Sequence, residues 1–133
     1  MKNTFSVCTA GVGACISYLY GGWSTLLGIL LVFVTVDYVT GVAAAAIEGK
    51  LSSAVGLKGI AKKIFIFVIV AVAHLIDTAL GGTSSLIRDA AIFFYMANEI
   101  LSILENAGRA GVPIPPVISQ AVEMLKNKGN APT

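Results

Sequence analysis

Long apolar segments alternate with short polar ones, and an acidic residue lies inside three of the apolar segments. These are residues 24–47 with Asp37, residues 64–80 with Asp77, and residues 86–104 with Glu99. A segment of about 20 apolar residues is long enough to cross a bilayer. A charged side chain within such a segment costs about 2.5–3.5 kcal/mol, so it persists where it has polar partners or water. The sequence therefore predicts membrane helices whose acids either are satisfied at helix–helix contacts or face a polar interior.

The composition also indicates a membrane protein. Of the 133 residues, 56% are hydrophobic and 12% are charged, whereas a soluble domain carries about 25% charged residues. The formal net charge of +2 is too small to indicate a nucleic-acid partner.

The residues that most enzymes need are not brought together by any recognisable motif. One histidine and two cysteines do not make a metal site, and residues 56–59 lack the spacing of a phosphate-binding loop. We therefore expect no catalytic residue, no metal and no cofactor.

Cys8 and Cys15 lie too far apart along a helix for an intrachain disulfide. We expect them to be small packing residues, with a disulfide between subunits as the alternative.

Residues 5–23 are uncharged but contain four glycines and are only moderately apolar. This segment could span the membrane, or it could lie in the interface with its aromatic residues at headgroup level. We adopt the spanning interpretation. Gly21-Gly22 is expected to break the helix before the next segment.

Positively charged residues predict the orientation of the segments. Residues 48–63 contain four lysines against a single acid, Glu48; the lysines are Lys50, Lys58, Lys62 and Lys63. Lysines beside membrane segments mark the cytoplasmic side, so we expect 48–63 to be a cytoplasmic loop, with Lys62 and Lys63 snorkelling towards the surface. The uncharged residues 81–85 are then outside, and the C-terminus is cytoplasmic. Arg88 is expected near the outer face, paired with Asp89.

Polar and small residues recur at helical spacing inside the apolar segments. The candidates for a polar interior or pore are Asp37, Thr40, Gly41, His74, Asp77, Tyr95, Asn98, Glu99 and Ser102. Such a stripe could line a water-filled space in an assembly, or it could be a hydrogen-bonded seam between packed helices. The sequence leaves both interpretations open.

A break at residues 113–116 precedes a short amphipathic segment, which we expect to rest on the inner membrane surface or on a neighbour. Residues 127–133 are expected to be frayed. The predicted organisation is a transmembrane helical domain over 1–108 and a cytoplasmic amphipathic helix and tail over 109–133. The predicted fold is an all-α integral membrane helical bundle of three to four transmembrane helices plus this short helix.

Several short motifs occur along the chain in a fixed order. They are Asp37-Tyr38-Val39-Thr40-Gly41, residues 49–53, 56–63, 76–78, 93–99 and 102–106, and Val112-Pro113-Ile114-Pro115. Together they resemble the toxin-secretion/phage-lysis holin family over residues 20–128. The resemblance implies a small protein of a phage or prophage of Gram-positive bacteria that oligomerises in the cytoplasmic membrane and permeabilises it. The implied partners are membrane lipid, further copies of the chain, and an endolysin or toxin that is released.

Two other functional classes fit the same pattern of spans and acids. A small proton-coupled exporter would use Asp37 or Glu99 to exchange protons for a substrate. An antiholin or structural membrane subunit would share the spans without forming a pore. Saturable transport of a defined compound without killing would distinguish the exporter. The sequence alone does not separate an antiholin from an active holin, because both use the same spans.

Overall fold

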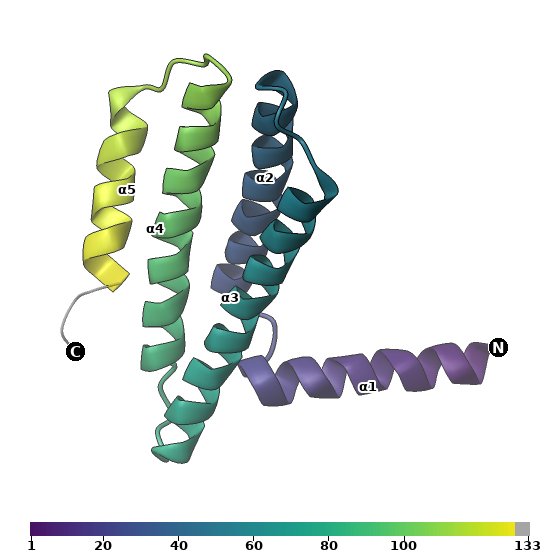
Figure 1. Ribbon diagram of the computed structural model, residues 1–133. Helices are drawn as coiled ribbons and strands as arrows, with labels where there is room; N and C mark the ends of the chain where they lie inside the picture. The colour runs from purple at the N-terminus through teal and green to yellow at the C-terminus, as the bar shows by residue number, and fades with distance from the viewer. Residues whose placement is uncertain (130–133) are drawn as a thin grey trace.

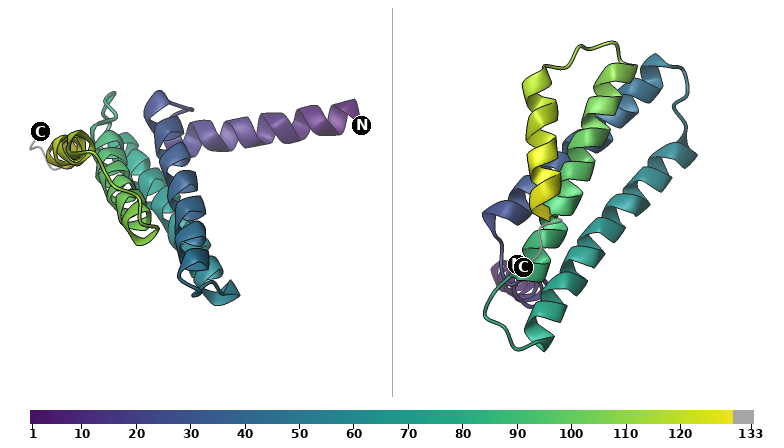
Figure 2. Two further views of the ribbon diagram at one scale, coloured as in Figure 1. Left: turned by 90° about the horizontal axis from the view of Figure 1, so that it is seen from above. Right: turned by 90° about the vertical axis from the view of Figure 1, so that its left-hand side faces the viewer.

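The computed structural model describes residues 1–129, and every regular element in this range is a helix. In chain order the helices are α1 (Lys2–Tyr20), α2 (Thr25–Ile47), α3 (Ser53–Ala79), α4 (Leu86–Arg109) and α5 (Pro116–Gly129). Helices α2, α3 and α4 form a bundle, α5 returns along α4, and α1 extends sideways from the lower end (Figures 1 and 2). The prediction of an all-helical fold is confirmed for these residues.

Helix α2 follows the predicted segment closely because its start is encoded locally. The Ser24 side chain accepts a hydrogen bond from the Leu27 amide at 3.1 Å, which satisfies an amide that the helix leaves unpaired. The chain leaves the helix at Gly49, whose φ of 70° lies in the left-handed region that glycine tolerates.

Helix α3 starts earlier than predicted, so the expected loop over residues 48–63 is wrong. Ser52 caps the helix by accepting a hydrogen bond from the Val55 amide at 3.2 Å, and α3 begins at Ser53. This early start places Lys58, Lys62 and Lys63 on a helix that packs against the bundle.

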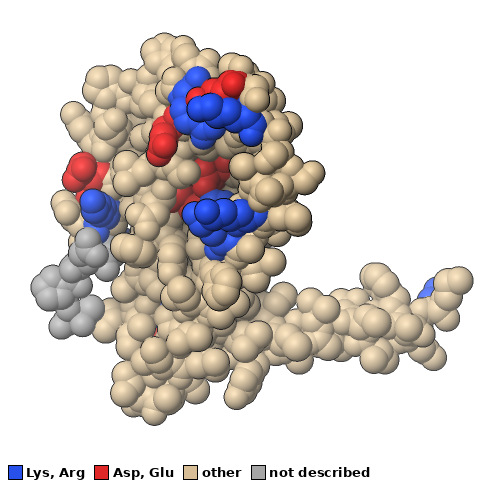
Figure 3. Space-filling view, in the orientation of Figure 1, with Lys and Arg blue, Asp and Glu red and all other residues tan. Residues whose placement is uncertain are grey.

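Charged side chains gather towards one end of the bundle. On the face shown in Figure 3 they lie over the upper half, whereas the lower half is almost entirely uncharged. The upper end is where α2 and α4 finish and α3 begins (Figure 1). On this face the charged side chains therefore lie mainly towards one end of the bundle.

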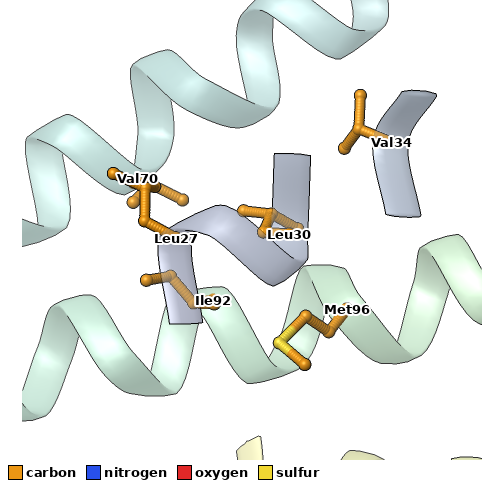
Figure 4. Packing of buried hydrophobic residues seen from close by; sticks show 6 residues of the cluster. All are labelled: Leu27, Leu30, Val34, Val70, Ile92 and Met96. Atoms are coloured by element: carbon orange, nitrogen blue, oxygen red, sulfur yellow. The ribbon is translucent and has the colours of Figure 1, made fainter. Parts of the chain in front are cut away.

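The apolar core lies between α2, α3 and α4. Its members are Leu27, Leu30 and Val34 of α2, Val70 of α3, and Ile92 and Met96 of α4 (Figure 4). Leu30, Val70 and Ile92 are fully buried. The three central helices are thus held by apolar packing, with α4 in contact with both of the others.

Helix α1 contacts the bundle near its C-terminal end. The Tyr20 hydroxyl donates a hydrogen bond to the Phe67 carbonyl of α3 at 3.1 Å. Gly21 ends the helix in the left-handed conformation at φ 74°, which confirms the predicted break. None of the residues described in α1 is buried, and Cys8 and Cys15 are exposed. The part of α1 that carries these cysteines does not contact the bundle, so their role as packing residues stays a prediction.

Helix α5 packs along α4. Val122 is 2% exposed, Leu125 packs against the core, and the Lys128 ammonium lies 4.5 Å from the centroid of the Phe93 ring. The sequence predicted that this segment rests either on the inner membrane surface or on a neighbour. In the structure it packs on a neighbouring helix, α4. Residues 127–129, which were expected to be frayed, belong to α5; residues 130–133 of that prediction lie outside the described residues.

The predicted boundary between a transmembrane domain and a cytoplasmic tail at residue 108 stays a prediction.

Two of the described helices, α2 and α3, are long and apolar enough to cross a membrane. Both are mostly unburied within the chain, because their outer sides present large apolar residues such as Val32, Phe65 and Val68.

Candidate functional site: a lysine between two buried carboxylates

A charged triad joins the three central helices above the apolar core. The Lys63 ammonium of α3 donates hydrogen bonds to Asp37 Oδ2 of α2 and, at 2.6 Å, to Glu99 Oε2 of α4. Asp37 is 6% exposed and Glu99 5% exposed, while the Lys63 side chain keeps 19% of its surface exposed. Each helix supplies one member, so the ion pairs depend on all three helices being in place.

Asn106 of α4 extends the triad into a polar network. Its Nδ2 donates to the Asp37 backbone carbonyl at 3.1 Å, to Asp37 Oδ1 at 2.9 Å and to Thr40 Oγ1 at 3.0 Å. A Cβ on Gly41 would lie 3.5 Å from the same nitrogen, in ordinary van der Waals contact, so the amide packs directly against this turn of α2. This network satisfies a polar side chain that is 5% exposed.

From Asn106 the polar contacts continue to the charged end of the bundle. Arg109 donates to Asn106 Oδ1 at 3.2 Å and to Glu48 Oε1 at 2.8 and 2.5 Å. The hydrogen bonds from Arg109 hold the pKa of the Glu48 carboxyl below its ordinary value. Hydrogen-bonded groups thus run without a gap from the triad to the ends of α2 and α4.

A cleft of about 200 Å³ opens beside the triad between α2, α3 and α4. Its polar lining includes Asp37, Lys63, Ser102, Asn106 and Arg109. The α3 side of the cleft contains Gly56 and Gly59, where an added Cβ would lie 3.3–3.4 Å from the Tyr38 side chain. Water can therefore reach one edge of the triad while its acids stay buried.

Asp77 belongs to a second polar cluster at the opposite end of α4. Its carboxylate accepts hydrogen bonds from the backbone amides of Ile87 at 3.0 Å and Arg88 at 2.9 Å, which caps the α4 N-terminus. Arg88 pairs with Asp89 at 3.0 Å, as predicted, and also donates to the Tyr20 carbonyl at 2.7 Å. Arg88 and Glu99 are separated by about 16 Å along α4, so the two clusters are distinct.

The remaining residues predicted for the polar interior lie in different parts of the bundle. Ser102 lines the cleft; Tyr95 is half-buried beside the apolar core. His74 lies against Gly21, and its Nδ1 has no hydrogen-bond partner among residues 1–129. Asn98 is exposed on the outer side of α4. The structure therefore gathers Asp37, Thr40, Gly41, Glu99 and Ser102, and keeps His74, Asp77 and Asn98 apart from them; a pore-lining role for any of these stays a prediction.

Lys63 and Asn106 were not among the predicted site residues. The sequence assigned Lys63 to a cytoplasmic loop because it directly precedes an apolar segment. A usable signal was present: buried Asp37 and Glu99 each needed a positive partner, and Lys62 and Lys63 were the nearest lysines to an apolar segment. The cap at Ser52 would have extended the helix far enough to bring Lys63 into the bundle.

These features define a small, all-helical membrane protein with a charged centre between three helices. Residues 14–127 match the bacteriophage holin family, so the chain belongs to that family. It is 51% identical to the uncharacterized protein BH0965 of Halalkalibacterium halodurans, over 95% of this chain and 96% of that one. It is 48% identical to the uncharacterized protein Lin0175 of Listeria innocua, over 96% and 91% of the two chains. It is 38% identical to an uncharacterized 14.9 kDa protein in the nagH 3' region of Clostridium perfringens, over 96% and 99%. No solved structure matches the chain.

Proposed function

We propose that this protein acts as a holin, whose copies assemble in the bacterial cytoplasmic membrane and open lesions that release an endolysin or a toxin for host lysis. The observation that carries the proposal is the triad of Lys63, Asp37 and Glu99, which joins α4 to the two helices that are apolar enough to span. Membership of the bacteriophage holin family supports it. Ionisable residues inside membrane segments are costly and mark functional sites by default, which supports a role for the triad in an assembled or open state.

The triad supports a mechanism with two states. In the closed state Lys63 neutralises acids from two other helices, and the apolar outer sides of α2 and α3 face lipid. When copies rearrange, the same polar groups exchange their partners for water and line the lesion. Loss of the membrane potential assists this step, since each elementary charge that crosses the field is worth about 2.3 kcal/mol per 100 mV.

We further propose that α2, α3 and α4 span the membrane, with the charged end of the bundle in the cytoplasm. Lys50 and Arg109 lie at that end, as the excess of positive residues on the cytoplasmic side requires. The turn between α3 and α4 is then outside, and α5 starts at the cytoplasmic end and returns along α4 as far as Phe93. Helix α1 runs sideways and none of its described residues is buried, which favours the interfacial placement over the spanning one.

The test is induced expression of the chain together with a cytoplasmic endolysin, following membrane potential and endolysin release in one culture. A holin gives an abrupt loss of potential that coincides with release of the enzyme. Cells that make the endolysin alone are the control and should retain it. Continued growth with an intact potential would contradict the proposal and leave the exporter and the antiholin as the remaining alternatives.

A further inference from the structure

Helices α3 and α4 each present a regular row of exposed residues. The α3 stripe consists of Lys58, Lys62, Phe65, Ile69, Val72 and Ile76, and the α4 stripe of Phe94, Asn98, Leu101, Glu105 and Gly108. In both rows the spacing alternates between four and three residues. This alternation is the pattern by which one helix packs along another.

The two stripes lie on one face of the molecule. On α3 the stripe is on the side away from Gly56, where an added Cβ would lie 3.3 Å from the Tyr38 hydroxyl oxygen of α2. On α4 it is on the side away from Met96 and Asn106, which pack against α2. Because α3 and α4 also contact each other, their stripes run side by side on the face away from α2. Figure 3 looks towards α3 and α4 and shows lysine or arginine and acidic groups close together there.

The charges on the two stripes lie at the same depth. Lys63 bonds Glu99 across the two antiparallel helices, so this pair marks a common level. Lys58 lies about 8 Å from that level along α3, and Glu105 about 9 Å along α4, both towards the charged end. Within residues 1–129 neither Lys58 nor Glu105 makes an ion pair. By the same reckoning Lys62 lies near the level of Asn98.

We propose that these two stripes form a docking face for a second copy of this chain, related to the first by a two-fold axis along the membrane normal. Such an axis keeps every residue at its own depth and lays the α3 stripe of each copy on the α4 stripe of the other. Lys58 then meets Glu105 of the second copy, and this ion pair forms twice. About 16 Å from each ion pair along the stripes, towards the other end of the bundle, Ile69 faces Phe94 of the second copy.

Two exposed polar residues favour a second copy over lipid as the occupant of this face. Lys62 and Asn98 are exposed near the level of the triad, where lipid offers neither a hydrogen-bond donor nor an acceptor. In the two-fold arrangement the Lys62 ammonium donates to the Asn98 side-chain carbonyl of the second copy. The face therefore carries apolar residues, opposite charges and a donor–acceptor pair that complement one another under one symmetry operation.

The first test is directed cross-linking in membranes of a chain in which the exposed Cys8 and Cys15 are replaced by serine. One tagged copy carries Ile69→Cys and a differently tagged copy carries Phe94→Cys, and the two are expressed together and oxidised. The expected result is a cross-linked heterodimer. The matched control replaces Ile69→Cys by Val32→Cys on the exposed side of α2, which is 56% exposed, and should cross-link weakly. Equal yields from both pairs, or none from the Ile69 pair, would overturn the proposal.

The second test uses the paired charges. Lys58→Glu and Glu105→Lys, introduced singly into both copies, should each lower the cross-linked fraction by about five-fold. The double variant restores the opposite charges in exchanged positions and should recover the yield, which also shows that the substituted chains insert and fold. A double variant that cross-links no better than the single variants would contradict the ion pair and with it this two-fold arrangement.

This interface rests on the membrane insertion proposed above, but its failure is distinguishable from failure of the holin function. Cross-linking reports the contact between copies, whereas depolarisation and endolysin release report the lesion. Release without this cross-link overturns the docking face alone. Cross-linking without depolarisation supports the docking face and contradicts the holin.

Discussion

Lys63 is the side chain on which the arrangement of the central helices most depends. It lies on α3 and bonds one carboxylate on each of the other two helices. Removing one partner of a buried ion pair leaves an uncompensated charge and costs about 3–5 kcal/mol. Since Lys63 serves two acids, its loss leaves both Asp37 and Glu99 without a positive partner among residues 1–129.

We therefore expect Lys63→Met to lower the free energy of unfolding by about 3 kcal/mol or more. Lys63→Arg retains the charge and two or more donors, so it should lose much less. Thermal unfolding in detergent micelles, followed by the helical circular dichroism signal, measures both. A Lys63→Met chain that unfolds at the wild-type temperature would show that the triad contributes little to the fold.

The acids of the triad should set when the lesion opens. Asp37→Ala and Glu99→Ala each remove a contact that ties α3 to a neighbouring helix, so we expect earlier depolarisation with insertion intact. The measurement is the interval from induction to loss of membrane potential, with the amount of protein in the membrane fraction as a check. Thr35→Ala is the control, because the Thr35 hydroxyl bonds the Leu31 carbonyl of its own helix. Wild-type timing in both acid variants would remove the triad from the mechanism.

Reasoning from single residues could find the two acids but not the base between them. Asp37 and Glu99 stand out because each is charged within an apolar segment. Lys63 stands beside such a segment, where a snorkelling side chain is ordinary. The difference is decided by contacts between helices that are far apart in the sequence, and no local pattern reports them.

At the scale of the helices, the close approach of α2 and α3 depends on small residues. A Cβ at Gly59 would lie 3.4 Å from the Tyr38 ring, so a longer side chain there must displace that ring or the helix. This approach brings Asp37 and Lys63 within bonding distance. Small residues at such contacts are typical of packed membrane helices.

We expect Gly59→Leu to destabilise the protein by about 1–3 kcal/mol, the cost of overpacking a close contact. Gly13→Leu on α1 is the matched control, because a Cβ at Gly13 meets nothing within 4 Å. Thermal unfolding of the two variants in the same detergent compares them. Equal stability would mean that α2 and α3 can separate at this point without cost.

Helix boundaries were predictable where capping residues and apolar segments agree. Helix α2 begins after Ser24 and ends at Ile47, as its sequence predicts. Helix α3 differs because the lysines at 58, 62 and 63 predict a cytoplasmic loop, whereas all three lie on the helix, Lys63 paired and the other two exposed. The glycines and moderate hydrophobicity of residues 5–23 left an interfacial course of α1 open, but its sideways direction depends on Tyr20 and Gly21 contacting α3.

At the scale of the whole molecule, positively charged residues such as Lys50, Lys58 and Arg109 lie mainly at one end of the bundle, and this asymmetry predicts its orientation. We expect a cysteine at position 50 (Lys50→Cys) to react with a membrane-impermeant thiol reagent only after cells are opened. A cysteine at position 84 (Ser84→Cys) should react in intact cells. Both variants need the Cys8→Ser and Cys15→Ser background, since the native thiols are exposed. The opposite labelling pattern would invert the proposed topology.

The cap that Asp77 places on α4 has a consequence for how the chain enters the membrane. Its two hydrogen bonds satisfy amides at the start of α4 within the turn that joins α3 to α4, and residues 79–87 carry no charge. In the proposed topology this turn must be carried across the apolar layer during biosynthesis. With these amides already bonded, and with Arg88 held by Asp89, the two helices can cross together as one hairpin. Asp77→Ala should therefore slow membrane integration of newly made chains.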